Sequence, residues 1–396
     1  MESEWDDTVT FDDDSSSSVC SSDASSNGDT SSAADSSESV CSADPSSDGS
    51  TDGVSSDSAT SSDESASDGG TTSSSSSQAV IGGWSDAVAG GWNSGARVQG
   101  NVQRIPLQGL SSLNQDPARN PATTESAAGR AILCVPSTLD ASQPVEVLLH
   151  LHGHNIGLRQ RVASSLPDAG TVHDVLMDQI EDQLGSSGRP MIALLPQGTL
   201  SSGFSNGTSA FDCDGFITEA LGAAVTAGVW SSALEISRVA LSAHSGGGGS
   251  VAVMAAQAGQ PHFPSKICAL FLFEAINGTN ELSSDTAYIT AKLNADLANL
   301  NAASDKLQYL KSSFRLRGVY NPQDDSPSAN YAALYPALRQ SIAAWFGRNA
   351  SAIGGVGSDT YNAFVANYQI VQPSPYVQHD GIVGGGNLAQ ALAMLT

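Results

Sequence analysis

Short and nearly continuous apolar segments recur along the chain between about residue 130 and its C-terminal end. Each has the length and the wealth of Val, Ile, Leu and Phe that is typical of a strand buried on both faces. The segments with this pattern are 130–136, 145–153, 191–198, the first half of 238–250, 266–275, 314–320 and 368–372. The pattern therefore predicts a sheet that is covered on both sides.

Segments with helical spacing alternate with these strands. One begins at Thr171, with Asp174 as its capping partner, and places the apolar residues of 172–184 on a single face. Further helices are predicted over 216–230, 286–310 and 331–346, and over the closing sequence NLAQALAML. Parallel strands need a crossover between them, so this alternation predicts one α/β domain with a mostly parallel sheet and helices on both faces.

The N-terminal part of the chain has a different composition. The segment 1–77 contains 18 of the 41 acidic residues and none of the 16 basic residues, so it carries most of the net charge of −25. Its Ser-rich and acidic sequence offers too little apolar surface to offset the entropy lost on folding, and we expect a disordered tail. We expect a linker or N-terminal extension over 78–124, with an extra strand or turn left open, and the folded domain over 125–396.

Composition also narrows the classes of function. The acidic balance argues against nucleic acid as a partner, because phosphates are bound by clustered Lys and Arg. The chain contains no run of 18 or more apolar residues, so no membrane span is predicted. Its first residues lack the basic region and apolar core of a signal peptide, which leaves a cytosolic location, export by another route and a removed leader all open. Five cysteines without a CxxC pair predict neither a disulfide framework nor a zinc site, and no cofactor is expected.

The sequence VALSAHSGGGGSVAVMAAQ joins a predicted strand to a predicted helix through a Gly-rich turn. A serine on such a sharp turn projects its hydroxyl above the sheet, and the residues two before and two after it must be small. Ala243 and Gly247 meet this requirement around Ser245, so we predict that Ser245 is a nucleophile. The following helix points its N-terminus at the site, which makes the Gly246 N–H a candidate oxyanion donor. A phosphate-binding turn is disfavoured, because Ser250 stands where a P-loop needs Lys.

The sequence HLHGHN at 150–155 ends the preceding predicted strand. A loop at this place supplies the second oxyanion donor, and the candidates are the N–H groups of Gly153 and His154. The alternation of His150, His152 and His154 also resembles a set of metal ligands. No carboxylate follows closely to complete such a set, and structural histidines in a buried strand are the simpler interpretation, so no metal is predicted.

The general base should be a histidine in a loop after the last strand. His379, in VQHDGIVGGG, follows the strand 368–372 and precedes a Gly-rich turn. It also satisfies the chain order of serine, then acid, then histidine. His244 directly precedes the nucleophile and is assigned to structural packing.

The acid that orients the imidazole has two candidate positions. Glu274 ends the strand 266–275 in an apolar setting, where an ionised group has no evident structural purpose. Asp324 and Asp325 lie in the loop after the next strand, but that loop is long and polar, so they can be solvated turn residues. Glu274 is preferred, and the choice stays open at this stage.

The order of these segments resembles the α/β-hydrolase superfamily, particularly its esterase and depolymerase-like branch. The resemblance rests on GRAILCVP, VEVLLHLHGHN, PMIALLPQG, VALSAHSGGG, LFLFEAING and VQHDGIVG, and it covers about residues 125–396. Ala243 departs from the Gly-x-Ser-x-Gly motif, a sterically mild change that is similar to some bacterial lipases.

The resemblance implies acyl-enzyme chemistry on a small or polymeric ester, with Ser245 attacking a carbonyl and His379 moving the proton. An amidase or peptidase with the same residues is the sibling interpretation. A binding protein that retains the hydrolase scaffold without activity is the interpretation from another class. The substrate and the oligomeric state do not follow, because this fold carries many reactions.

Overall fold

The computed structural model describes residues 80–81, 102–113, 129, 131–154, 178–198, 202–205, 210–257, 266–323 and 330–395. The chain divides into two units, Met1–Thr71 and Thr72–Thr396, and all described residues belong to the second. The predicted tail 1–77 therefore lies outside the described residues, as does the predicted helix start at Thr171. Asp324 and Asp325 also lie outside them.

A nine-stranded sheet forms the centre of the described part, in the order β1-β2-β3-β5-β4-β6-β7-β8-β9. The strands are β1 (Val80–Ile81), β2 (Val102–Gln108), β3 (Ala131–Pro136), β4 (Val145–Leu151), β5 (Met191–Pro196), β6 (Ile236–His244), β7 (Ile267–Phe273), β8 (Arg315–Val319) and β9 (Tyr368–Val371). From β5 to β9 all neighbours are parallel, whereas β1, β2 and β3 continue the sheet in antiparallel pairs. The predicted α/β class with a mostly parallel sheet is confirmed.

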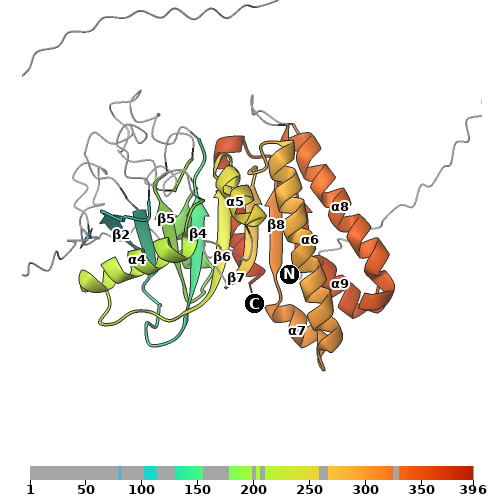
Figure 1. Ribbon diagram of the computed structural model, residues 1–396, viewed down its shortest axis with the longest axis horizontal. Coiled ribbons are helices and arrows are strands. Elements are labelled where there is room, and N and C mark those ends of the chain that lie inside the picture. The colour runs from blue at the N-terminus through green and yellow to red at the C-terminus, as the bar shows by residue number, and fades with distance from the viewer. Residues whose placement is uncertain are drawn as a thin grey trace, which may run out of the picture. The chain divides into compact units, whose positions relative to one another are not determined.

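Helices cover both faces of this sheet (Figure 1). They are α3 (Ile180–Ser186), α4 (Cys213–Thr226), α5 (Gly247–Ala256), α6 (Thr279–Ala302), α7 (Lys306–Ser312), α8 (Tyr331–Ile353), α9 (Asp359–Ala366) and α10 (Asn387–Ala393), with a 3-10 turn η2 (His379–Gly381). On one face α4, α5, α6 and α8 pack over the larger apolar core, and on the other α3 and α10 pack over a smaller one. In β4 the residues Leu149 and Leu151 face the larger core and Leu148 faces the smaller, which explains the continuous apolar sequence.

Two elements differ from the sequence-based expectation. The helix predicted over 286–310 is two helices, because Ala303 adopts an extended conformation after α6 and the Asp305 side chain accepts a hydrogen bond from the Gln308 N–H to begin α7. Strands β1 and β2 fall within 78–124, the segment for which a linker and an extra strand were both left open.

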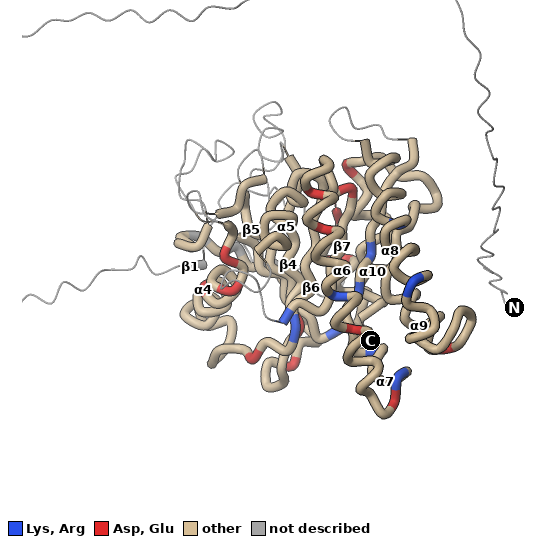
Figure 2. The backbone as a smooth tube through the Cα atoms, turned by 45° about the vertical axis from the view of Figure 1, so that its right-hand side comes forward, with Lys and Arg blue, Asp and Glu red and all other residues tan. Residues whose placement is uncertain are grey.

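Charged groups tie the amino ends of the central strands together. Glu146 on β4 is 6% exposed and accepts hydrogen bonds from Arg189 and Arg238, at 2.8 and 2.7 Å. Burial raises its pKa, but the two guanidinium groups hold the pKa below its ordinary value. Figure 2 shows acidic and basic positions interspersed along the described part of the chain.

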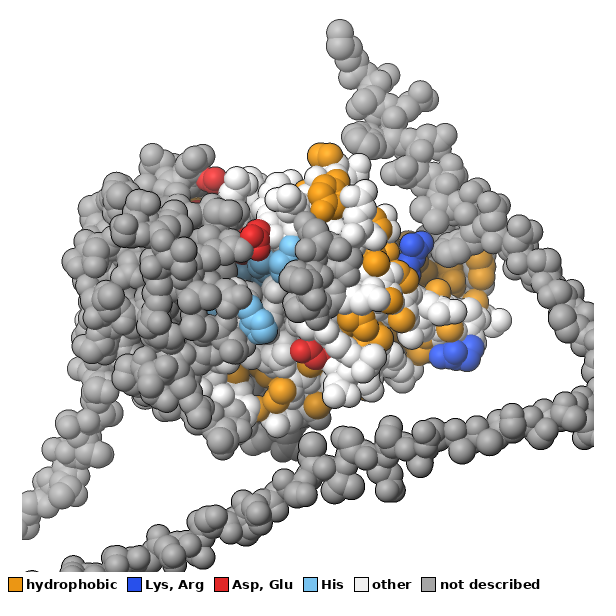
Figure 3. All heavy atoms as spheres, turned by 90° about the horizontal axis from the view of Figure 1, so that it is seen from above, with side chains coloured by type: hydrophobic (Ala, Val, Ile, Leu, Met, Phe, Trp, Pro, Cys, Tyr) orange, Lys and Arg blue, Asp and Glu red, His pale blue; other side chains and the backbone are white. Residues whose placement is uncertain are grey.

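The carboxyl ends of parallel strands meet at one edge of a sheet, and the loops there are the usual place for a site. Seen from above, histidine side chains reach the surface near the middle of this face, close to an acidic side chain, and hydrophobic side chains lie farther along it (Figure 3). None of the helices in the described part has the combination of length and apolarity that crossing a bilayer requires.

Candidate active site

Ser245 occupies a sharp turn between β6 and α5. Its φ of 49° lies in the left-handed region, which a residue with a side chain seldom adopts. Two backbone hydrogen bonds hold this turn. The Ser245 N–H donates to the Phe273 carbonyl at 3.1 Å, and the Ser245 carbonyl accepts from the Gly248 N–H at 3.0 Å. A Cβ on Gly248 would overlap the Ala275 carbonyl, so the start of α5 can approach β7 only because glycine stands there.

His379 lies directly above this serine. The chain leaves β9, crosses the carboxyl end of β8 and enters η2 at His379, whose side chain is 19% exposed. Its Nε2 lies 2.9 Å from the Ser245 Oγ, and its Nδ1 lies 2.5 Å from Glu274 Oε2. The structure therefore brings the predicted serine, histidine and glutamate into one continuous set of contacts.

Glu274 is 1% exposed and follows directly after β7. Its φ of 45° turns the side chain out of the strand direction, and its N–H still donates to the Val319 carbonyl on β8. One carboxylate oxygen faces His379, and the other accepts a hydrogen bond from the Asn321 N–H at 2.7 Å. The Asn321 side chain in turn donates to the carbonyl of Val377, so the loop that carries His379 is tied to the acid.

These contacts assign the proton on the imidazole. An ionised carboxylate only accepts hydrogen bonds, so Nδ1 of His379 must carry a hydrogen to bond Glu274. In the neutral imidazole with this tautomer Nε2 is an acceptor, and it faces the hydroxyl of Ser245.

The sheet order and the strand–turn–helix at Ser245 together decide the fold, with serine, acid and histidine following one another along the chain. The chain has the α/β-hydrolase fold. The carboxylate that contacts His379 is that of Glu274, after the strand next to the one that leads to Ser245, and this is the earlier of the two positions that the sequence left open.

No protein-family model matches the chain, and no curated protein matches its sequence. It is similar in structure to an S-formylglutathione hydrolase from Agrobacterium tumefaciens, with 13% identity, a TM-score of 0.37 and coverage of 76% of this chain and 98% of the other. A thermostable esterase from Pseudomonas putida shows 14% identity, a TM-score of 0.33 and coverage of 77% and 84%. A cold-adapted esterase from an Arctic metagenomic library shows 14% identity, a TM-score of 0.31 and coverage of 75% and 96%. The fold assignment itself rests on strand order and on the turn at Ser245.

The loop after β4 lies beside Ser245. A Cβ on Gly153 would be 3.0 Å from the Ser245 Cβ and 3.5 Å from its Oγ, so the backbone here passes the Ser245 hydroxyl closely. The side chain of His154 lies against Gly246, where a Cβ would overlap its ring. No described residue accepts a hydrogen bond from the backbone N–H groups of Gly153, His154 or Gly246.

The alternating histidines at the end of β4 do not converge. His150 places Nδ1 3.0 Å from the Ser242 hydroxyl, whereas His152 accepts a hydrogen bond from the Gly198 N–H at 2.8 Å and donates to the Gly153 carbonyl. In the part of the chain that the structure describes, no group of three or more His, Cys, Asp or Glu side chains could hold a metal ion.

His244 has a contact that its sequence position did not reveal. Its Nε2 donates to the backbone carbonyl of His379 at 3.1 Å, and the two rings lie 5.0 Å apart. Burial lowers the pKa of His244 to about 4, while burial raises the pKa of the nearby Asp178 carboxyl. His244, assigned to packing from the sequence, thus holds the backbone of the catalytic candidate.

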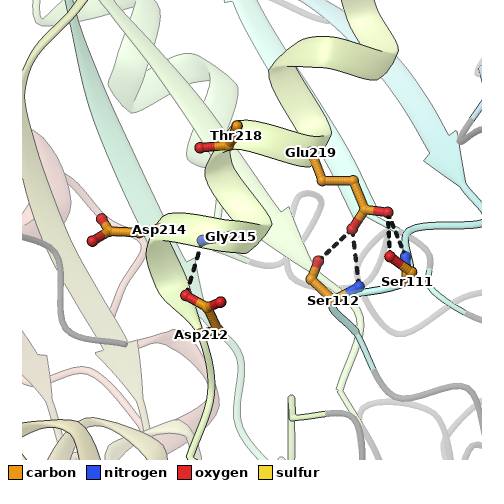
Figure 4. Close-up of a pocket in the computed structure, with 7 residues that line it drawn as sticks. All are labelled: Ser111, Ser112, Asp212, Asp214, Gly215, Thr218 and Glu219. Atoms are coloured by element: carbon orange, nitrogen blue, oxygen red, sulfur yellow. Dashed lines mark hydrogen bonds between the residues drawn. The ribbon is translucent and has the colours of Figure 1, made fainter. Parts of the chain in front are cut away.

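A hollow of about 650 Å³ lies away from these residues, at the start of α4 (Figure 4). Two of its acidic side chains hold the local structure. Glu219 accepts hydrogen bonds from Ser111 and Ser112, and Asp212 caps α4 by accepting one from the Gly215 N–H. Asp214 is exposed at its rim. These contacts hold the segment after β2 against α4 and identify no ligand.

Proposed function

We propose that this α/β-hydrolase is a serine hydrolase that cleaves carboxylic esters through an acyl-enzyme on Ser245. The observation that carries the proposal is the unbroken series of contacts from Glu274 through His379 to the Ser245 hydroxyl. A hydroxyl is a weak nucleophile unless a base takes its proton as it attacks, and this arrangement supplies the base.

In the first half-reaction the Ser245 Oγ attacks the ester carbonyl carbon while its proton passes to Nε2 of His379. The carbonyl π bond becomes an oxyanion, and the tetrahedral intermediate then expels the alcohol oxygen, which takes the proton from Nε2. In the second half-reaction a water gives its proton to Nε2 and attacks the acyl carbon. Expulsion of the serine oxygen, which regains the proton, releases the carboxylic acid.

Glu274 serves these steps without exchanging a proton. Its buried carboxylate holds Nδ1 protonated and stabilises the imidazolium that forms when Nε2 takes the serine proton. Because Glu274 is 1% exposed, water is excluded from around its carboxylate. The attraction between this carboxylate and the imidazolium is correspondingly strong.

The N–H groups of Gly246 and of the Gly153–His154 loop are the proposed oxyanion donors. Gly153 and His154 follow β4 and Gly246 follows Ser245, and within the described part of the chain no residue accepts a hydrogen bond from their N–H groups. Donors that are fixed before the reaction stabilise the developing negative charge without reorganisation.

A fluorophosphonate probe tests the assignment, because it phosphonylates only a serine activated by a base. We expect the wild type to be labelled, and Ser245→Ala to show neither labelling nor hydrolysis of p-nitrophenyl acetate. Ser250→Ala is the matched control: it removes a hydroxyl one turn along α5 that bonds the Ser202 carbonyl, and it should label like the wild type.

Equal labelling of wild type and Ser245→Ala would overturn the proposal. An unlabelled but folded wild type would favour the binding-protein alternative. Faster cleavage of aminoacyl anilides than of p-nitrophenyl esters would assign the same residues to an amidase, because amide cleavage makes the greater demand on protonation of the leaving group.

A further inference from the structure

Two tyrosines one helical turn apart open α8 and lie against the candidate triad. Tyr331 and Tyr335 are 1% and 0% exposed. Residues at i and i+4 share one face of a helix, so both rings point from α8 toward the carboxyl ends of the strands. Neither entered the sequence-based assignment of the site.

The Tyr335 hydroxyl holds the turn that contains Glu274. It donates to the Leu272 carbonyl at 3.1 Å and accepts from the Ala275 N–H at 2.8 Å, so it bonds the backbone on both sides of the acid. That turn places Glu274 at a positive φ, a conformation that persists only where its surroundings fix it. Burial raises the pKa of the Tyr335 hydroxyl well above its ordinary value, so the proton that it donates stays in place.

The ring of Tyr335 has little freedom to move. It stacks on Tyr320 with ring centres 5.1 Å apart and an interplanar angle of 11°. On β8, a Cβ placed on Gly318 would come within 3.0 Å of the Tyr335 ring, so the glycine leaves room for it. The hydroxyl is therefore presented from a fixed position.

Tyr331 contacts His379 directly and is linked to Ser245 through Asn277. Its ring stacks on the imidazole of His379, with centres 5.4 Å apart and an angle of 14° between the planes. Its hydroxyl donates to Asn277 Oδ1 at 3.0 Å, and Asn277 Nδ2 donates to the Ser245 carbonyl at 3.0 Å. One side chain thus touches the base directly and the nucleophile's backbone through a single residue.

We propose that Tyr331 and Tyr335 are positioning residues that hold the acid, the base and the nucleophile in register from the first turn of α8. The inference rests on the proposed hydrolase function. It follows from the geometry because Ser245 and Glu274 both adopt positive φ, and a small relaxation of either would lengthen the proton-transfer contacts. Neither tyrosine need touch the substrate.

Three variants test the two contacts separately. Tyr335→Phe removes the hydroxyl that holds the Glu274 turn, Tyr331→Phe removes only the link to Asn277, and Tyr331→Leu removes the ring stack as well. We expect kcat for p-nitrophenyl acetate to fall about 10- to 100-fold in Tyr335→Phe and Tyr331→Leu, and by less in Tyr331→Phe, with KM little changed. The partial recovery from Leu to Phe at position 331 is a result that general loosening of the fold would not give.

Tyr368→Phe is the matched control. This tyrosine on β9 is also buried, at 5% exposure, and its hydroxyl donates at 2.8 Å to Asp296, toward the C-terminal end of α6. Asn277, which bonds the Ser245 carbonyl, lies just before the opposite end of that helix. Tyr368→Phe should lower the melting temperature while leaving kcat unchanged. If Tyr335→Phe does not fold, the comparison of Tyr331→Phe with Tyr331→Leu still tests the proposal.

The outcomes separate the two proposals. If Ser245→Ala abolishes activity but folded Tyr331→Leu keeps wild-type kcat, the positioning inference is wrong and the hydrolase proposal stands. A loss in kcat that Tyr368→Phe matches would also overturn it, since the effect would then follow stability alone. Full activity in Ser245→Ala would instead remove the hydrolase proposal itself.

Discussion

Replacing Glu274 with glutamine tests the acid assignment by exchanging one carboxylate oxygen for an NH₂ group. The carboxylate accepts two hydrogen bonds, from Nδ1 of His379 and from the backbone N–H of Asn321. A glutamine amide has one acceptor and one donor end, and the backbone N–H cannot turn away. The amide oxygen must therefore face Asn321, which leaves the NH₂ group facing His379.

This orientation favours the wrong imidazole tautomer. Opposite an NH₂ group, Nδ1 becomes the acceptor and the hydrogen moves to Nε2, which can then no longer take the proton of Ser245. Restoring the active tautomer leaves two buried donors facing each other, which costs about 2–3 kcal/mol. Loss of the carboxylate charge removes a further stabilisation of about 2–3 kcal/mol from the imidazolium in the transition state. Together these effects predict a fall in kcat of about 10³- to 10⁴-fold.

The assay is kcat for p-nitrophenyl acetate, with melting temperature as the check on folding. Asp296→Asn is the matched control, because this buried carboxyl on α6 also accepts two hydrogen bonds, from the hydroxyls of Tyr309 and Tyr368. Hydroxyls can rotate to suit an amide, and Asp296 is not part of the triad, so kcat should be unchanged. A folded Glu274→Gln that keeps more than about a tenth of wild-type kcat would refute this reasoning. A large loss in Asp324→Asn instead would move the acid to the later loop.

Two further predictions concern folding. Gly248→Ala should destabilise the protein by about 3 kcal/mol in urea unfolding, because its methyl group would overlap the Ala275 carbonyl. Gly249→Ala, with only the flexible Glu281 side chain 3.3 Å away, should be neutral or gain up to about 1 kcal/mol, and equal effects would contradict the close-approach argument. Burial lowers the pKa of His150 from 6.5 to about 3, so below pH 6.5 His150 binds a proton in the unfolded chain but not in the folded protein. The free energy of unfolding therefore falls as pH falls from about 6.5 to about 3. His150→Gln should reduce the slope of this free energy against pH by about 1.4 kcal/mol per pH unit. An unchanged slope between pH 6 and 4 in urea unfolding would count against the prediction.

Local pattern was enough for much of the framework. A strand buried on both faces reads as a continuous apolar run, and β4, β5 and β7 were all predicted for that reason. The turn at Ser245 was predicted because small residues and glycines are required within a few positions of it along the chain. His379 was predicted from its place after the last strand and before a Gly-rich turn, and from the chain order.

Other features left little or no signal in the local pattern. The break between α6 and α7 was missed because Ala303 carries no local stop signal, and only the cap at Asp305 marks it. His244 was assigned to packing, since its partner is a backbone carbonyl 135 positions away. Tyr331 and Tyr335 read as apolar positions on the buried face of a helix.

The sequence by itself determined the alternation of strands and helices, the sharp turn at Ser245 and the order of the candidate catalytic residues. These depend on spacing within one element, where period and residue size act over a few positions. Only the tertiary structure set Glu274 within 2.5 Å of His379, because β7 must first lie beside β6 and the loop after β9 must cross the end of β8. Hydrogen bonds between distant segments decide such contacts, and their partners become neighbours only when the sheet has formed.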